Sequence, residues 1–220
     1  MKDMCKRFII LVIGIFFVSF GVSLTVKSLL GTSPITSIPY VCSLDYPFSL
    51  GTWNIIFNIG FVVVQILILR RQFKWIQLAQ ILMAFGFGYF IDLSMYVLQN
   101  LHLAAYYAKF IGLLCGITII AFGVSLEVMA NIIMLPADNI VKVIAAKWNF
   151  DFGITKTCFD VSMVLIAAGL SLGSFQDIYG IREGTLVAAL FTGSIARFFI
   201  RMLQRTDSPE NMEYAEENAQ

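Results

Sequence analysis

The chain has 220 residues; 59% are hydrophobic, only 13% are charged, and the mean hydropathy is +0.82. A water-soluble chain of this length could not bury so much apolar surface, so we expect a lipid bilayer to surround most of it. The formal net charge of +1 excludes a general electrostatic attraction to nucleic acid.

Six apolar stretches are long enough to span a membrane, which takes about 20 residues. The last two are weaker because charged residues such as Lys156, Asp160 and Arg197 lie within them. The first follows basic residues, as a signal core would, but it is longer and lacks a cleavage motif, so we interpret it as an uncleaved span. The predicted spans are 8–30, 51–69, 75–98, 109–134, 154–173 and 183–203.

Two further apolar segments, 34–44 and 136–148, are too short to span a bilayer. Each begins at a proline shortly after a predicted span. We predict that both are short, broken helices. The sequence leaves open whether they re-enter the membrane or lie on its surface.

Basic residues gather on one side of the predicted topology. With the N-terminus in the cytoplasm, only Lys27, Lys109 and Arg182 of the 15 lysines and arginines fall on the outer side. Basic residues favour the cytoplasmic side, so both termini are predicted to be cytoplasmic. Residues 1–205 are predicted to form a single membrane domain, and 206–220 an acidic, disordered cytoplasmic tail.

The sequence contains an internal repeat. The run FGVSL at 20–24 recurs at 122–126, an offset of 102. After the second span the offset becomes about 105, which pairs Gly88 with Gly193. The offset of 102 also pairs, without a gap, Gly14 with Gly116, Val26 with Val128, Pro34 with Pro136, Phe48 with Phe150, Gly51 with Gly153 and Phe57 with Phe159.

The two repeats are roughly 8–98 and 110–204, and each holds three spans. An odd number of crossings makes the second copy enter the membrane from the opposite side. The predicted fold is therefore an all-α polytopic membrane protein with six transmembrane helices in two inverted three-helix repeats. This architecture is common among secondary transporters and also occurs in channels.

Several motifs in order along the chain resemble the YczE-like (YczE/YyaS/YitT) family of bacterial integral membrane proteins. The resemblance covers nearly the whole chain and implies a location in the bacterial plasma (inner) membrane. It brings no biochemical activity with it. The motifs are GTSPITSIPY at 31–40, LGTWNIIFN at 50–58, LPADNIVKV at 135–143, ITKTCFD at 154–160 and GIREGT at 180–185.

Candidate binding residues lie at the two breaks. Ser33 can cap a helix that begins at Pro34, and Thr36 follows in its first turn. The second break offers Asp138 and Asn139. A helix that begins within a membrane presents free N–H groups and a positive dipole end, which suit an anionic or polar group. The structural alternative is a surface loop followed by an interfacial helix.

A second set of candidates lies on spans 2 and 5. The repeat matches Asn54 with Lys156 and Asn58 with Asp160, and each pair shares one helical face. Polar groups at membrane depth usually face a cavity or a partner. We predict a substrate site between these spans; the alternative is that Lys156 and Asp160 merely pair with one another.

Glu127 lies within span 4 and is a candidate ion-coupling carboxylate. A structural ion pair, for example with Lys27, is the alternative. Asp92 and Arg197 match at the offset of 105, but inversion would place them on opposite membrane sides. Small residues at 19, 21, 23, 121, 123 and 125 are interpreted as helix-packing positions.

The residues favour transport over catalysis. The single histidine, His102, argues against a histidine metal site, and the cysteines show no metal-ligand spacing, so no cofactor is expected. Motifs for ATP hydrolysis or a serine hydrolase are missing, and we expect no enzyme. We predict a secondary transporter or exporter of a small polar or anionic solute. A passive channel, a substrate-binding subunit working with a partner, an intramembrane enzyme and a homo-oligomer stay open.

Overall fold

The computed structural model describes residues 2–177 and 179–204, which form eight α-helices and two short 3-10 helices and contain no strand. Six helices are long and apolar enough to cross a membrane. The first half holds α1 (Lys2–Ser28), α2 (Pro34–Asp45), α3 (Leu50–Leu69), the 3-10 turns Arg70–Gln72 and Trp75–Leu78, and α4 (Ala79–Val97). The second half holds α5 (Tyr106–Ala130), α6 (Pro136–Trp148), α7 (Phe152–Phe175) and α8 (Glu183–Gln204).

The six predicted spans are confirmed, but two of them end earlier than predicted. The break after α1 begins at Leu29 (φ 59°) and the break after α5 at Asn131 (φ 45°). This left-handed conformation ends an α-helix. The short helices α2 and α6 then begin at Pro34 and Pro136, whose fixed φ suits a first helical turn.

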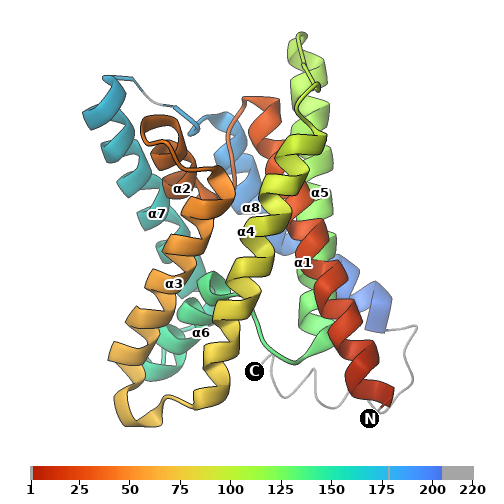
Figure 1. The fold of residues 1–220 in the computed structure, drawn as a ribbon, viewed down its shortest axis with the longest axis vertical. Helices are drawn as coiled ribbons and strands as arrows, with labels where there is room; N and C mark the ends of the chain where they lie inside the picture. Colours follow the sequence, from red (N-terminus) through yellow and green to blue (C-terminus); the bar gives the residue numbers. More distant parts are fainter. Residues whose placement is uncertain (1, 178, 205–220) are drawn as a thin grey trace.

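Helices α1 and α5 pack against each other in an antiparallel manner on one side of the molecule, at the right in Figure 1. A Cβ atom added to Gly14 would lie 3.0 Å from the carbonyl oxygen of Gly123, and one added to Gly21 would lie 2.7 Å from that of Gly116. Only glycine allows two helix backbones to approach so closely. These glycines therefore set the packing of α1 on α5.

Two of the remaining long helices flank this pair, and the other helices pack beyond them. Helix α4 packs along α1, where Ser19 and Ser23 donate hydrogen bonds to α4 carbonyl oxygens at 3.1 and 3.2 Å, and α8 packs along α5. Helix α2 packs mainly on α7, and α6 packs mainly on α3. Helix α3 also packs closely along α4, whereas the described parts of α7 and α8 have no comparable packing.

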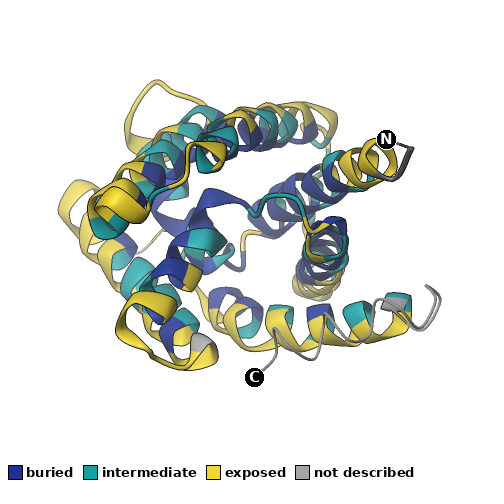
Figure 2. Cartoon of the chain, turned by 90° about the horizontal axis from the view of Figure 1, so that it is seen from below, coloured by how far each residue is buried: buried dark blue, intermediate teal, exposed yellow. Residues whose placement is uncertain are grey.

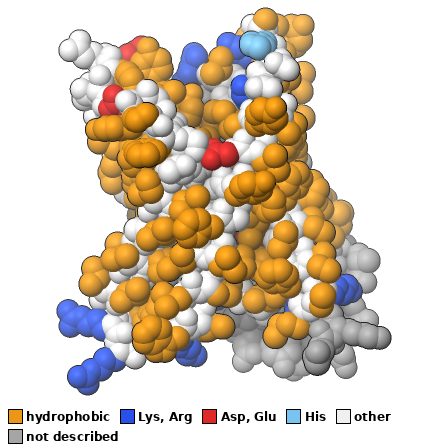
Figure 3. Space-filling view, viewed as in Figure 1, with side chains coloured by type: hydrophobic (Ala, Val, Ile, Leu, Met, Phe, Trp, Pro, Cys, Tyr) orange, Lys and Arg blue, Asp and Glu red, His pale blue; other side chains and the backbone are white. Residues whose placement is uncertain are grey.

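The outer surface of the molecule is apolar. Buried faces point inward and exposed faces outward in the view along the long axis (Figure 2), and hydrophobic side chains cover the surface between the two ends (Figure 3). Leu67, Leu165 and Leu190 are among the large side chains that lie exposed on this surface. Because water would not solvate such a surface favourably, the protein is a membrane protein.

The suggested ion pair between Lys27 and Glu127 is wrong. Lys27 lies in the last turn of α1, whereas Glu127 lies beside Gly14, at the middle of that helix. The antiparallel crossing of α1 and α5 separates the two side chains along the bundle. The Lys27 ammonium group instead donates a hydrogen bond to the carbonyl oxygen of Gln99 at 3.5 Å.

Candidate functional site

A cluster of three charged side chains joins the first turn of α6 to α7. The ammonium group of Lys156 on α7 lies 3.2 Å from a carboxylate oxygen of Asp138 and 3.0 Å from one of Asp160. Lys156 and Asp160 are one helical turn apart, so they do pair with one another, and Asp138 joins them from α6. The cluster carries two carboxylates against one ammonium group.

A second polar network joins α6 to α3 and α4. Asn139 donates a hydrogen bond to Oε1 of Gln65 at 2.8 Å, and Gln65 donates to the carbonyl oxygen of Pro136 at 3.0 Å and to Gln80 at 3.3 Å. Gln65 and Gln80 are both buried. The sequence analysis missed them, although Gln65 shares its helical face with Asn54 and Asn58, which could have indicated it.

We expect Gln65→Leu to lower the free energy of unfolding by about 2–3 kcal/mol, because buried polar groups on Pro136, Asn139 and Gln80 would lose their partner. Thermal unfolding of the detergent-solubilised protein measures this change. Thr118→Val is the matched control, since the exposed Thr118 hydroxyl only bonds to the carbonyl oxygen of Leu114 on its own helix. Equal stability of the two variants would contradict the network.

Asn54 and Asn58 lie on the buried face of α3, where their side chains are 1% and 2% exposed. Each side-chain amide nitrogen donates to the backbone carbonyl oxygen four residues earlier, at 2.9 Å. A carbonyl oxygen can only accept, so these bonds fix the orientation of both amides. Both side-chain oxygens are then buried acceptors without a hydrogen-bond partner in the part of the chain that the structure describes.

The two matched polar pairs differ in their access to solvent. Helices α3 and α7 approach one another where Phe61 and Phe159 meet edge to face, with ring centroids 5.7 Å apart. The side chain of Lys156 is 27% exposed and that of Asp160 is 14% exposed, in contrast to the buried asparagines on α3. Helix α4 packs on α3, whereas in the described residues α8 does not pack comparably on α7.

The first break leads into another part of the molecule. Helix α2 lies in the upper half of the view and α6 in the lower half (Figure 1). Ser33 and Thr36, at the start of α2, are therefore not brought into the cluster around Asp138. Each short helix packs mainly on a long helix of the other half of the chain, which keeps the two breaks apart.

The capping prediction for Ser33 is wrong. Its side chain makes no capping hydrogen bond, and its carbonyl oxygen accepts from the backbone of Thr36 at 2.9 Å. The start of α8 supports this break instead. The backbone N–H of Thr32 donates to the Thr185 hydroxyl at 3.2 Å, and Gly184 donates to the carbonyl oxygen of Leu30 at 2.8 Å.

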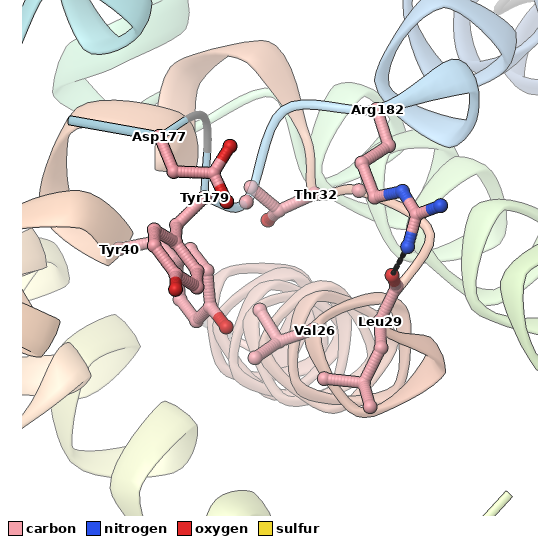
Figure 4. Close-up of a pocket in the computed structure, with 9 residues that line it drawn as sticks. Val26, Leu29, Thr32, Tyr40, Asp177, Tyr179 and Arg182 are labelled. Carbon is pink, nitrogen blue, oxygen red and sulfur yellow. Dashed lines mark hydrogen bonds between the residues drawn. The ribbon is translucent and has the colours of Figure 1, made fainter. Parts of the chain in front are cut away.

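A pocket of about 450 Å³ opens beside this junction. Tyr40 and Tyr179 lie on one side of it, and Arg182 on the other, where it donates to the carbonyl oxygen of Leu29 at 3.4 Å (Figure 4). Asp177 and Thr32 add polar groups to the rim. This pocket was not predicted from the sequence, because its walls come from two segments that are far apart in the chain, one around the break after α1 and one before α8.

Among the described residues, Glu127 has no hydrogen bond or ion pair with either cluster, although it lies close enough to Asp138 for their charges to interact. The side chain of Glu127 is 4% exposed and lies against Gly14 of α1, and one of its carboxyl oxygens has no hydrogen-bond partner. A buried carboxyl group without a fixed partner is suited to exchanging a proton. Among residues 2–177 and 179–204, no group of three His, Cys, Asp or Glu side chains is placed to hold a metal ion.

Comparisons with known proteins support the resemblance seen in the sequence. The model of a family described as a family of unknown function, DUF6198, matches residues 5–201. Two Bacillus subtilis (strain 168) proteins are each 26% identical. "Uncharacterized membrane protein YczE" aligns over 198 residues (90% of this chain, 86% of that protein), and "Uncharacterized protein YyaS" over 194 residues (88% and 92%). The YczE-like resemblance is thus confirmed. No solved structure gives a significant match.

Proposed function

We propose that this chain, which belongs to the DUF6198 family of membrane proteins, is a secondary transporter that moves a small polar solute across the bacterial plasma membrane. The proposal combines an inverted repeat with polar side chains that line its interior. The observation that carries it is the pair of matched polar sites, one partly exposed and one buried. Transport requires such sites to be reached from one side of the membrane at a time.

Reciprocal contacts support the inverted repeat. Gly14 touches Gly123 and Gly21 touches Gly116, and the offset of 102 matches Gly14 with Gly116 and Gly21 with Gly123. Such exchange of partners is what a two-fold axis produces between two copies. The packing of α2 on α7 and of α6 on α3 follows the same rule. An axis in the membrane plane would run between α1 and α5.

The basic residues support the orientation of the repeat. Twelve of the 15 lysines and arginines belong to the side of the two termini, and Lys27, Lys109 and Arg182 to the other. The start of α1 and the described end of α8 both lie at the lower end of the molecule (Figure 1). We therefore place that end in the cytoplasm. The charged cluster at Lys156 would then be reached from the cytoplasm.

The chemistry of the sites favours a polar solute with hydrogen-bond donors. The two carboxylates of Asp138 and Asp160 outnumber the single ammonium group of Lys156, which leaves the cluster with a surplus negative charge. At the other site, the side-chain oxygens of Asn54 and Asn58 are free acceptors. These groups attract hydroxyl, amide or ammonium groups. A simple anion would meet the surplus carboxylate, so the anionic solutes that the helix starts alone suggested fit less well.

Counterflow in proteoliposomes tests the transport activity. Liposomes with the purified protein are loaded with one unlabelled solute at a time from a panel of polyols, amines, amino acids and carboxylates. We expect transient accumulation of the labelled solute for a donor-bearing member of the panel, with saturation. Empty liposomes are the control. Flux without saturation or counterflow would instead indicate a channel, and the absence of flux across the panel would contradict both.

We propose that Glu127 couples transport to protons. Glu127→Gln keeps the size and burial of the side chain but cannot release a proton. We expect this variant to retain counterflow within about twofold and to lose at least tenfold of the accumulation that a pH gradient drives. Unchanged pH-driven accumulation would remove Glu127 from coupling. A loss of counterflow as well would indicate a role in binding or folding instead.

A second candidate function is a substrate-binding subunit that works with a partner. Only 11% of the most apolar stretch of α7, and 11% of that of α8, is buried within the molecule. This low burial favours the alternative, because these helices leave a face free for another protein. A partner with an ATPase activity that co-purifies from the native membrane, and without which no flux occurs, would support this alternative.

A further inference from the structure

The two helical hairpins of the molecule are in different states. In α3–α4, a Cβ atom added to Gly51 would overlap the carbonyl oxygen of Gly88, and one added to Gly88 would lie 2.6 Å from the carbonyl oxygen of Gly51. The carboxylate of Asp92 on α4 accepts from the Ser49 hydroxyl at 2.6 Å and from the backbone N–H of Gly51 at 2.8 Å. This hairpin is closed by backbone contact and by a polar bond.

The α7–α8 hairpin holds the matching glycines without the matching contact. In the repeat, Gly51 corresponds to Gly153 at the offset of 102, and Gly88 corresponds to Gly193 at the offset of 105. Among the described residues, a Cβ atom on Gly153 would meet only Asp151, at 3.2 Å, and one on Gly193 would meet nothing within 4 Å. Glycine is a poor helix former, and in the open hairpin these two glycines allow no close contact between helices that would offset this cost.

The polar bond also has a counterpart with complementary charges. At the same offsets, Ser49 corresponds to Asp151, and Asp92 corresponds to Arg197. At present Asp151 caps its own helix by accepting from the backbone N–H of Ile154 at 2.9 Å, and Arg197 donates to the carbonyl oxygen of Gly193 at 3.4 Å. An acid and a base therefore occupy the positions where a hydroxyl and an acid bind each other in the closed hairpin.

Two buried polar groups of α3 are unpaired in the closed hairpin. The side-chain oxygens of Asn54 and Asn58 are buried acceptors without a partner. Such groups normally find a partner in protein or in water, so these two oxygens are available to accept a hydrogen bond from a solute that reaches them. Their counterparts on α7 of the open hairpin, Lys156 and Asp160, are partly exposed.

We propose that the protein has a second conformation in which α8 closes on α7 through Gly153 and Gly193, with Asp151 bonded to Arg197, while α4 leaves α3 and uncovers Asn54 and Asn58. The two hairpins exchange roles, as the repeat would require. The uncovered asparagine oxygens then accept hydrogen bonds from the hydroxyl or ammonium groups of the solute on the side of the membrane opposite the termini. The inference gives the proposed transporter its second access state.

Disulfide trapping tests the closure directly. Gly153→Cys and Gly193→Cys are combined in a chain from which the native cysteines, Cys5, Cys42, Cys115 and Cys158, have been replaced. Gly193 has open space around it and Gly153 meets only the end of the Asp151 side chain, so the pair should fold. In native membranes treated with copper phenanthroline, we expect an intramolecular disulfide in more than half of the molecules, because closure would bring the residues as near as Gly51 and Gly88.

The controls separate closure from other causes. Gly153→Cys with Phe191→Cys keeps the same hairpin but places the second thiol on an outward, exposed part of α8, and we expect at least tenfold less cross-linking. Charge reversal at Arg197→Asp should reduce trapping of the 153–193 pair at least threefold, and adding Asp151→Arg should restore it. A structural role of either residue alone would not give this restoration.

Two results would overturn the proposal. The first is an unbridged 153–193 pair in a folded protein whose thiols both react with a small maleimide. The second is a bridge only between molecules, which would show that a second copy covers α7 and α8. The trapping needs no solute, so its outcome is independent of the counterflow assay. If the disulfide forms but no flux is measured, only the transport proposal is rejected. If flux is measured but the disulfide does not form, only the proposed exchange between the hairpins is rejected.

Discussion

Replacing Gly21 by leucine is expected to lower the free energy of unfolding by about 3 kcal/mol or more, which would remove most of the folded protein. A Cβ atom at this position would lie 2.7 Å from the carbonyl oxygen of Gly116 and 2.8 Å from the backbone nitrogen of Ile120. Both neighbours are helix backbone, which cannot move aside as a side chain can. The two helices would have to separate along their length.

The expected loss is measured by fluorescence-detected size exclusion after a series of heating steps. Gly86→Leu is the matched control, because a Cβ atom at Gly86 of α4 meets nothing within 4 Å. We expect this variant to keep wild-type stability within about 0.5 kcal/mol. If Gly21→Leu unfolds at the wild-type temperature, α1 and α5 do not pack through their glycines, and the reciprocal contacts that support the repeat are lost.

The course of the chain could be predicted from the sequence because spans and breaks depend on local features. Apolar runs mark the six long helices, and prolines mark the starts of α2 and α6. The ends of α1 and α5 were placed too late because Leu29 and Asn131 turn left-handed within apolar sequence. That turn depends on packing of the following segment, which a hydropathy pattern does not contain.

The candidate site could be predicted only in part. The face shared by Lys156 and Asp160 follows from their spacing, but the addition of Asp138 depends on how α6 packs beside α7. Gln65 shares a helical face with Asn54 and Asn58, but two of its partners follow it by more than 70 positions, so its bonds depend on how α6 packs on α3. The erroneous pairing of Lys27 with Glu127 had the same origin, because the register of α1 on α5 is set by glycine contacts.

Replacing Asn58 by leucine is expected to stabilise the folded protein by about 1–2 kcal/mol and to reduce counterflow at least tenfold. The side-chain oxygen of Asn58 is buried and unpaired in this conformation, which costs about 1–3 kcal/mol. Leucine fills a similar volume and removes the unpaired acceptor. The lost bond to the carbonyl oxygen of Asn54 matters little, because that oxygen faces the helical N–H of Asn58 as well.

This opposite change in stability and activity separates a functional residue from a structural one. A structural asparagine would lose stability on replacement, and its effect on flux would follow from unfolding. Thermal unfolding and counterflow are measured on the same preparation, with Ser162→Ala as the control. Ser162 lies on the matching repeat helix α7, but its hydroxyl only bonds to the carbonyl oxygen of Phe159. A less stable Asn58→Leu variant with unchanged flux would mean that the closed α3–α4 hairpin is the permanent state of the protein. The buried acceptors would then have no part in carrying a solute.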